Sequence, residues 1–175
     1  SRLGPPEKKK NQAKEITATS PATAAPIWVC LLKENVNNAI INLGGNVLCV
    51  GNKNNEQFMV GLTDPQEIDQ SILTLTIDDL SVVTSGVYQR YFELNGQKYH
   101  HILNPQTGYN YENGLSSVTI ISKTSLQADT LSTVCFSLGK EKGIELLNSM
   151  DDVYGCFIDE NNQISYSNGF EEYIR

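Results

Sequence analysis

The sequence lacks the features by which several large protein classes are recognised. It contains no run of the roughly 18 apolar residues that a membrane-spanning helix needs, and none of its four cysteines forms a Cys-x-x-Cys pair. The glycine-rich phosphate loop, the dinucleotide-binding fingerprint, the nucleophile elbow and the HExxH zinc helix are also absent. The net charge of −7 argues against binding to nucleic acid or to an anionic membrane as the main role.

What remains has the composition of one globular domain. The chain has 175 residues, of which 39% are hydrophobic and 19% are charged, and this is enough for a core of useful size. Cys49, Cys135 and Cys156 lie within apolar runs. We expect these cysteines and Cys30 to be buried free thiols, with a disulfide or a zinc site as the alternative.

The first 27 residues differ in character from the rest. Residues 1–15 are mostly polar and include three consecutive lysines, and residues 17–26 are rich in Ala, Thr, Ser and Pro. No apolar stretch long enough for a signal peptide precedes Trp28. We expect residues 1–27 to form a disordered tail or linker, with a nucleic-acid-binding arm as the alternative, and residues 28–175 to form the domain.

Apolar runs bounded by turn residues predict a series of strands. The expected strands cover residues 39–43, 47–50, 58–62, 72–77, 81–84, 91–94, 98–103, 117–122, 154–158 and 163–166. Asn95-Gly96, which lies between two of them, is a strong hairpin signal.

Two helices are expected after the strand at residues 117–122. Thr124 and Gln127 form a capping box for a helix that Gly139 can end, and a second helix follows over residues 141–148. Residues 29–34 look like the end of a further helix. The apolar face of the capped helix comprises Leu126, Leu131, Val134, Cys135 and Leu138. The fold class is therefore α+β, a mostly antiparallel sheet with helices packed on one side.

Asp129 and Thr133 are the first candidate site residues. They stand four residues apart on the capped helix, so both side chains project from one face. A carboxylate and a hydroxyl suit Mg²⁺, which takes one or two carboxylates and completes its shell with water and phosphate oxygens. The alternative is a surface carboxylate with an incidental hydroxyl beside it.

His101 is the candidate general base. Strand alternation places it on the face opposite His100 and Ile102, just before a Pro-containing turn, and an imidazole titrates near neutral pH. The alternative is a histidine that only makes hydrogen bonds at a strand end. His100 is expected to be structural.

Two short segments could approach a ligand closely. Gly44-Gly45 follows a strand, and its backbone amides can face a phosphate, although such a pair usually marks a turn. Residues 84–86 (Thr-Ser-Gly) end another strand in the same ambiguous way. Tyr88, Arg90 and Tyr91 could stack on a planar ring, whereas Phe92 is expected in the core.

Four separated segments carry a pattern when they are taken together. They are residues 39–46 (Ala-Ile-Ile-Asn-Leu-Gly-Gly-Asn), 84–92 (Thr-Ser-Gly-Val-Tyr-Gln-Arg-Tyr-Phe), 100–108 (His-His-Ile-Leu-Asn-Pro-Gln-Thr-Gly) and 128–133 (Ala-Asp-Thr-Leu-Ser-Thr). In this order they resemble the C-terminal half of the domain of the FAD:protein FMN transferase, or ApbE, family. Asn104 stands where the family usually has Asp, and Asn110 where Pro commonly follows Gly-Tyr. The fold is accordingly expected to be incomplete at its N-terminus relative to the family.

The resemblance implies an enzyme that uses FAD and Mg²⁺. Such enzymes transfer FMN from FAD to a Thr or Ser hydroxyl of an acceptor flavoprotein and release AMP. By this resemblance His101 is the catalytic residue, and Asp129 and Thr133 hold Mg²⁺. The residues that the resemblance places at the flavin cofactor are Asn42, Gly44, Gly45, Thr84, Ser85, Gly86, His101 and Thr107.

Other functions remain open at this point. Water instead of a protein hydroxyl could attack FAD, which would make the chain an FAD pyrophosphatase, or the chain could be a non-catalytic flavin-binding remnant. The resemblance also implies an acceptor subunit in a redox-driven ion pump, no nucleic-acid partner, and a location on the extracytoplasmic side of the cell membrane. Self-association through the exposed face of the half-domain is a further expectation.

Overall fold

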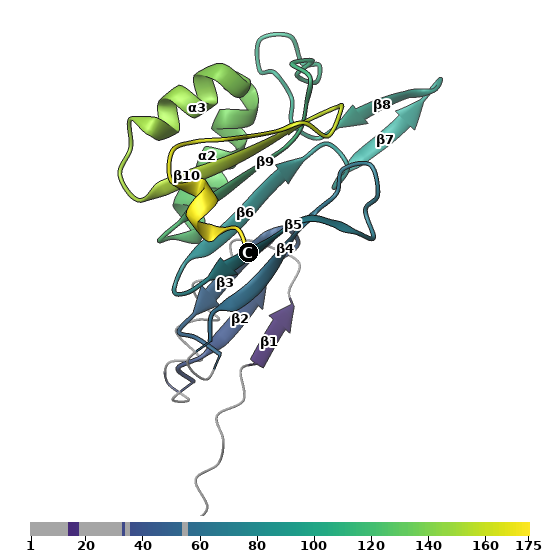
Figure 1. Ribbon diagram of the computed structural model, residues 1–175. Coiled ribbons are helices and arrows are strands. Elements are labelled where there is room, and N and C mark those ends of the chain that lie inside the picture. The colour runs from purple at the N-terminus through teal and green to yellow at the C-terminus, as the bar shows by residue number, and fades with distance from the viewer. Residues whose placement is uncertain (1–13, 18–32, 34–35, 54–55) are drawn as a thin grey trace, which may run out of the picture.

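The computed structural model describes residues 14–17, 33, 36–53 and 56–175 (Figure 1). The strands are β1 (Lys14–Thr17), β2 (Ala39–Asn42), β3 (Asn46–Val50), β4 (Phe58–Thr63), β5 (Ser71–Ile77), β6 (Ser81–Gly86), β7 (Tyr91–Leu94), β8 (Gln97–His100), β9 (Leu115–Ser122), β10 (Val153–Asp159) and β11 (Ile164–Tyr166). The helices are α2 (Ser125–Leu138), α3 (Lys140–Asn148) and the 3-10 helix η2 (Phe170–Tyr173).

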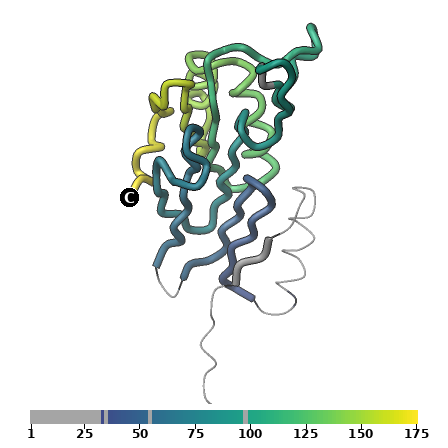
Figure 2. Tube along the Cα trace, turned by 90° about the vertical axis from the view of Figure 1, so that its right-hand side faces the viewer, coloured from purple at the N-terminus to yellow at the C-terminus, as the bar shows by residue number. Residues whose placement is uncertain are grey.

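One large sheet organises the described residues. Its strand order is β1-β2-β3-β6-β9-β10-β11, and every neighbouring pair is antiparallel except β1 with β2. β4 with β5 and β7 with β8 form two separate hairpins. The predicted α+β class with a mostly antiparallel sheet is therefore confirmed. In Figure 2 strands β2 and β3 lie toward the lower end of the coloured trace and helices α2 and α3 toward the upper end.

Both faces of the sheet are covered. Helices α2 and α3 pack on one face, as predicted, and the β4–β5 hairpin and η2 pack on the other (Figure 1). Ile120 belongs to the buried cluster on the helical side with Phe136, whereas its neighbour Ile121 belongs to the cluster on the hairpin side with Phe58. All eight residues of β9 are buried for this reason.

Helix α2 begins as predicted but turns a different face to the sheet. The Thr124 hydroxyl accepts a hydrogen bond from the Gln127 amide at 3.3 Å, and Gly139 follows the last helical residue. Leu126, Val134 and Leu138 of the predicted apolar face are exposed. The buried residues of α2 are Ala128, Ser132, Cys135 and Phe136. The small side chains Ala128 and Ser132 let the helix lie close to the sheet, and packing distance overrides the simple count of apolar residues.

Several other sequence predictions are decided by the structure. Within the predicted tail, residues 14–17 form β1 on the edge of the sheet, while the rest of residues 1–27, the helix end at 29–34 apart from Lys33, and Cys30 lie outside the described residues. Phe92, predicted in the core, is 62% exposed and stacks on Tyr99 across the β7–β8 hairpin. The expected strand at 98–103 ends at His100, because the Asn104-Pro105 turn follows.

The thiol prediction holds for the three described cysteines. Cys49, Cys135 and Cys156 are free and buried. Among the described residues, no helix has the length and apolar character needed to cross a membrane.

Candidate active site

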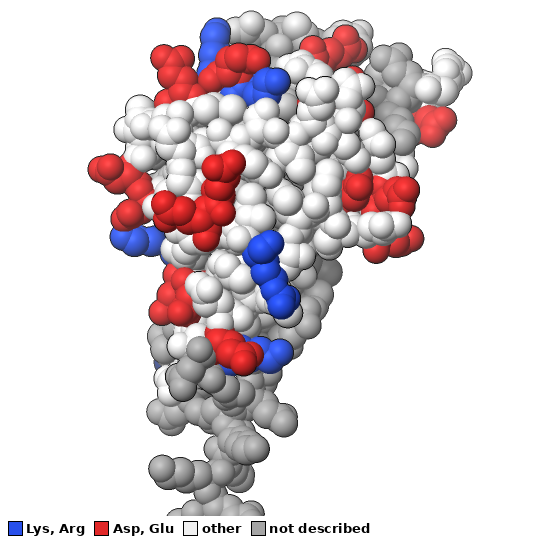
Figure 3. Space-filling view, viewed as in Figure 1, with Lys and Arg blue, Asp and Glu red and all other residues white. Residues whose placement is uncertain are grey.

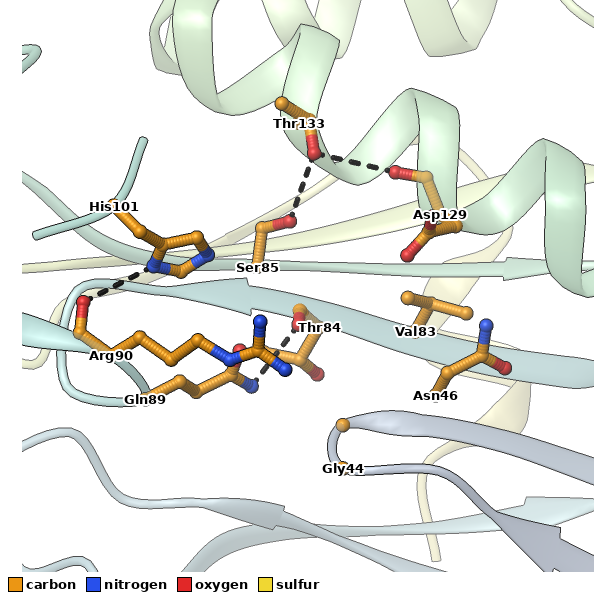
Figure 4. Close-up of a pocket in the computed structure, with 11 residues that line it drawn as sticks. Gly44, Asn46, Val83, Thr84, Ser85, Gln89, Arg90, His101, Asp129 and Thr133 are labelled. Atoms are coloured by element: carbon orange, nitrogen blue, oxygen red, sulfur yellow. Dashed lines mark hydrogen bonds between the residues drawn. The ribbon is translucent and has the colours of Figure 1, made fainter. Parts of the chain in front are cut away.

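A small polar cleft lies where the β2–β3 turn, β6 and α2 meet (Figure 4). Its volume is about 140 Å³. The residues that line it are Gly44, Gly45, Asn46, Val83, Thr84, Ser85, Gln89, Arg90, His101, Asp129 and Thr133. Seven of the ten residues predicted at the site are therefore brought together, although they come from four separate segments of the chain.

Asp129 and Thr133 line the α2 side of the cleft. The spacing of four residues places them one helical turn apart, and the Thr133 hydroxyl lies 3.4 Å from the main-chain oxygen of Asp129. In Figure 4 the Asp129 carboxylate turns toward Val83 and Asn46 at the floor of the cleft. Two oxygen donors thus face the same space, as the sequence pattern predicts.

Ser85 joins strand β6 to this part of α2. Its hydroxyl oxygen lies 2.8 Å from that of Ser132 and 3.3 Å from that of Thr133. Ser132 also donates to the main-chain oxygen of Asp129 at 2.9 Å. Ser132 was not among the predicted site residues, and it lies on the buried side of the helix between the two candidate ligands.

His101 faces the cleft from the opposite side. Its Nδ1 lies 3.2 Å from the main-chain oxygen of Arg90, and its own amide donates to the same oxygen at 3.1 Å. Because a carbonyl oxygen can only accept, Nδ1 carries a proton, and in the neutral tautomer with this contact Nε2 has the free lone pair. Figure 4 shows the second ring nitrogen on the side toward Ser85. The ring is thus oriented as a general base would need to be.

His100 has a different environment from its neighbour. Its ring is 8% exposed and packs edge-on against Phe136 with ring centroids 5.7 Å apart. Its Nδ1 accepts a hydrogen bond from the Ile102 amide at 3.3 Å. Burial lowers the pKa of His100, since the charged ring would lose hydration. These contacts agree with the structural role expected for this residue.

The β2–β3 turn is held tightly against β6. Gly44 and Gly45 both have positive φ, and the Gly45 carbonyl accepts from the Thr84 amide at 2.9 Å. Gln89 donates to the Thr84 carbonyl at 3.1 Å. A Cβ at Gly45 would lie 2.7 Å from Nε2 of Gln89, so only glycine fits at this position without moving the neighbouring amide.

Four lining residues were not among the predicted site residues, namely Asn46, Val83, Gln89 and Arg90, and two of these have polar groups of interest. Arg90 extends its guanidinium group into the cleft below His101 (Figure 4), and none of the ion pairs formed by the described residues involves it. Asn46 is 2% exposed, and its Oδ1 has no hydrogen-bond partner among the described residues. A buried amide oxygen without a partner is costly, and it is typical of a position that meets a ligand. The sequence signal for Asn46 was its place directly after the paired glycines.

Three predicted cofactor residues do not line the cleft. Asn42 borders an adjacent hollow that shares Gly45 and Thr84 with it. Gly86 packs against the Tyr88 ring, to which a Cβ would come within 2.8 Å. Thr107 accepts a hydrogen bond from the Tyr109 amide at 3.3 Å within an exposed turn. The last two have structural roles at turns.

The donor set of the cleft suits a hard cation only in part. No group of three or more His, Cys, Asp or Glu side chains in the described part of the chain could hold a metal ion. One carboxylate and one hydroxyl, from Asp129 and Thr133, match the few protein ligands that Mg²⁺ takes when phosphate oxygens complete its shell. The residues therefore fit Mg²⁺ bound together with a phosphate-containing ligand.

The negative net charge of the sequence is visible on one face of the molecule. On the face shown in Figure 3, acidic side chains form several groups, and the basic side chains are scattered among them.

Comparison with known proteins identifies the family. The family model described as "ApbE family" matches residues 22–158. The chain belongs to the ApbE family. A FAD:protein FMN transferase from Klebsiella pneumoniae is 44% identical over 138 residues, which cover 78% of this chain and 42% of the relative. A second, from Treponema pallidum, is 36% identical over 150 residues, which cover 80% of this chain and 41% of the relative.

Solved structures agree with the fold of this ApbE-family chain. The ApbE protein of Thermotoga maritima superposes with a TM-score of 0.79 at 32% identity, covering 88% of this chain and 50% of that one. The flavinyl transferase ApbE of Pseudomonas stutzeri, in its apo form, gives a TM-score of 0.70 at 28% identity, covering 87% and 48%. The chain thus spans less than half the length of the two curated relatives and about half of each solved protein.

Proposed function

We propose that this chain forms part of an enzyme that transfers FMN from FAD to a Thr or Ser hydroxyl of an acceptor flavoprotein, with Mg²⁺ as cofactor and AMP as the second product. Membership of the ApbE family supports the proposal, and relatives from Klebsiella pneumoniae and Treponema pallidum carry the name FAD:protein FMN transferase. The observation that carries it is the cleft itself, which His101 lines together with Asp129 and Thr133, with its second ring nitrogen on the side toward Ser85 (Figure 4).

The reaction that fits these residues is an attack on a phosphorus atom of the FAD pyrophosphate. The acceptor hydroxyl oxygen forms a bond to the phosphorus of the FMN part, and the bond from that phosphorus to the AMP oxygen breaks. His101 accepts the hydroxyl proton on Nε2, while the Arg90 carbonyl holds its Nδ1–H. The Arg90 guanidinium group would pair with phosphate oxygens.

Asp129 and Thr133 would hold Mg²⁺, which when bound supplies charge neutralisation for the pyrophosphate and for the leaving AMP. Asn46 and the Gly44-Gly45 turn line the β2–β3 side of the cleft, where they would contact the ligand. The side chains of the cleft thus divide into a proton acceptor, a cation site and a ligand-binding wall.

The size of the cleft favours one part of FAD over the whole molecule. Pockets for whole cofactors measure roughly 300–1,000 Å³, whereas this cleft measures about 140 Å³. We propose that the pyrophosphate and its immediate neighbours occupy it. From the family resemblance alone, we also propose an acceptor subunit of a redox-driven ion pump and an extracytoplasmic location.

The test is the product formed from FAD. The chain is incubated with FAD, Mg²⁺ and an acceptor flavoprotein, and covalent flavin is detected by in-gel fluorescence and mass spectrometry, with free FMN measured by chromatography. Covalent flavin that is lost in His101→Ala but kept in Thr107→Ala supports transfer. Free FMN alone would favour the pyrophosphatase function. Absence of both products, together with no FAD binding by calorimetry, would contradict the proposal and favour a non-catalytic remnant.

A further inference from the structure

A buried chain of hydroxyl groups connects β6 to the candidate metal ligand on α2. Ser132 is fully buried and Ser85 is nearly so. The hydroxyl oxygens of the two serines are 2.8 Å apart, and that of Thr133 lies 3.3 Å from that of Ser85. The Ser132 hydroxyl also contacts the main-chain oxygen of Asp129 at 2.9 Å.

The direction of each hydrogen bond among these hydroxyl groups follows from the Asp129 carbonyl, which is the last acceptor. The Asp129 carbonyl can only accept, so the 2.9 Å contact is a hydrogen bond only if Ser132 donates its one proton there. The 2.8 Å contact then requires Ser85 to donate to Ser132. With the proton of Ser85 committed, the 3.3 Å contact is a hydrogen bond only if Thr133 donates to Ser85.

This order of hydrogen bonds determines how the Thr133 hydroxyl is oriented at the cleft. Its proton points inward, toward Ser85, and its remaining lone pairs are left for the cleft. A hydroxyl binds a cation through a lone pair, and one that turned its proton toward the cation would repel it. We propose that Ser85 is a positioning residue that holds the Thr133 hydroxyl in the orientation of a cation ligand. Ser132 fixes the direction in which the hydroxyl groups donate. This inference rests on the proposed role of Thr133 as an Mg²⁺ ligand.

The proposal changes the role expected for Ser85. The sequence resemblance places it at the flavin, whereas its short contacts are to Ser132 and Thr133. The Thr133 hydroxyl also lies 3.4 Å from the Asp129 carbonyl, which would accept its proton weakly if Ser85 were removed. Loss of Ser85 should therefore weaken the cation site and leave part of it intact.

The protein contains a second pair of serines that serves as a matched control. Ser81, on the same strand, lies with its hydroxyl oxygen 2.9 Å from that of Ser125 on the same helix, and it is fully buried. Neither residue lines the cleft. Ser81→Ala therefore removes an equivalent hydroxyl link between β6 and α2 without touching Thr133.

The first measurement uses the ligand-free chain. Hydroxyl-proton exchange followed by NMR should be slow for Ser85 and Ser132, and Ser85→Ala should speed exchange of the Thr133 hydroxyl severalfold, while Ser81→Ala should not. Equal exchange of Thr133 in the wild type and in Ser85→Ala would overturn the hydroxyl chain. This result does not depend on FAD or on Mg²⁺.

The second measurement is the Mg²⁺ concentration that half-saturates FAD binding, obtained by calorimetry. Partners of metal ligands typically contribute 10- to 100-fold to metal affinity; because the Asp129 carbonyl remains, we expect about a 10-fold loss in Ser85→Ala and none in Ser81→Ala. The double variant Ser85→Ala/Thr133→Val should be no weaker than Thr133→Val alone. Additive losses would show that Ser85 acts on the ligand directly and would overturn the proposal.

The two measurements separate this inference from the proposed function. If Thr133→Val binds Mg²⁺ and FAD as the wild type does, the metal role of Thr133 fails and the positioning proposal fails with it. The same holds if neither the wild type nor any variant binds them. If Thr133→Val weakens Mg²⁺ binding while Ser85→Ala leaves both Mg²⁺ affinity and Thr133 exchange unchanged, only the role of Ser85 is refuted.

Discussion

His100 and His101, neighbours in the sequence, hold opposite tautomers. His101 donates through Nδ1 to the Arg90 carbonyl at 3.2 Å, so the neutral ring has its lone pair on Nε2. His100 accepts at Nδ1 from the Ile102 amide at 3.3 Å, so its proton is on Nε2. One ring offers a lone pair to the cleft, and the other is used in packing against Phe136. The local backbone therefore selects which of the two can act as a base.

Removing the His101 ring should affect catalysis and leave ligand binding intact. We expect His101→Ala to lower the rate of flavin transfer by roughly 10²- to 10⁴-fold, the usual contribution of a general base, with FAD affinity within twofold of the wild type. Nitrogen-15 NMR of the ligand-free chain should show Nδ1–H for His101 and Nε2–H for His100. An equal loss of FAD affinity and of rate would instead make His101 a binding residue.

The stability of the fold should fall in mild acid because of His100. Burial lowers the pKa of its ring below the ordinary 6.5, so between these two values the unfolded chain binds more protons than the folded one. The contribution is complete above pH 6.5 and is lost as the pH falls through the lowered pKa of the folded state. Urea unfolding at pH 7.5 and pH 5.5 measures it. His100→Gln, which cannot titrate, should show a smaller difference between the two pH values, and an unchanged difference would contradict the assignment.

Much of the fold was predictable because its signals are local. Asn95-Gly96 and Gly44-Gly45 are turn sequences whose geometry depends on their own backbone, and all four residues have positive φ in the predicted turns. The convergence of Asp129 with Thr133 follows from helical spacing alone. Their approach to His101 does not follow from any local rule. It was predicted only because four motifs in order resemble one family.

The remaining features depend on packing between distant segments. Which face of α2 is buried was predicted wrongly, because close approach to β6 favours Ala128 and Ser132 over the larger Leu126. Asn46 and Arg90 reach the cleft through the β2–β3 turn and the segment after β6, whose relative placement the sequence does not specify. Thr107 belongs to a matching motif, yet its hydroxyl serves its own turn.

The three described cysteines should resist alkylation in the native protein. Burial raises the pKa of Cys49 and Cys156 to about 12 and that of Cys135 to about 11, from an ordinary 9.0. The reactive thiolate is therefore depleted roughly 100- to 1,000-fold at pH 8. In a Cys30→Ser variant, iodoacetamide should label no cysteine without denaturant and three in urea. Rapid native labelling would show that one of these thiols opens to solvent.

The two glycines of the β2–β3 turn should differ in their tolerance of alanine. Both have positive φ, so each substitution strains the backbone by about 1–2 kcal/mol. A Cβ at Gly44 meets nothing within 4 Å, whereas at Gly45 it would strike the Gln89 amide, which bonds to the Thr84 carbonyl. Gly45→Ala should therefore lower the free energy of unfolding and FAD affinity more than Gly44→Ala does. Urea unfolding and calorimetry test this, and equal effects would exclude a role for the Gln89 contact.

Asn46 should contribute to ligand binding at the cost of stability. Its buried Oδ1 lacks a partner among the described residues, and such an atom destabilises a fold by roughly 1–3 kcal/mol. Asn46→Leu, which keeps the branch at Cγ and removes the polar atoms, should raise the free energy of unfolding of the ligand-free chain by about 1 kcal/mol and weaken FAD binding at least 10-fold. Asn46→Asp serves as a control that keeps size and an acceptor oxygen while adding charge beside Asp129, and it should weaken binding without stabilising the fold. Loss of stability in Asn46→Leu would show that the amide makes net favourable contacts in the absence of ligand, and unchanged FAD affinity would remove Asn46 from the binding wall.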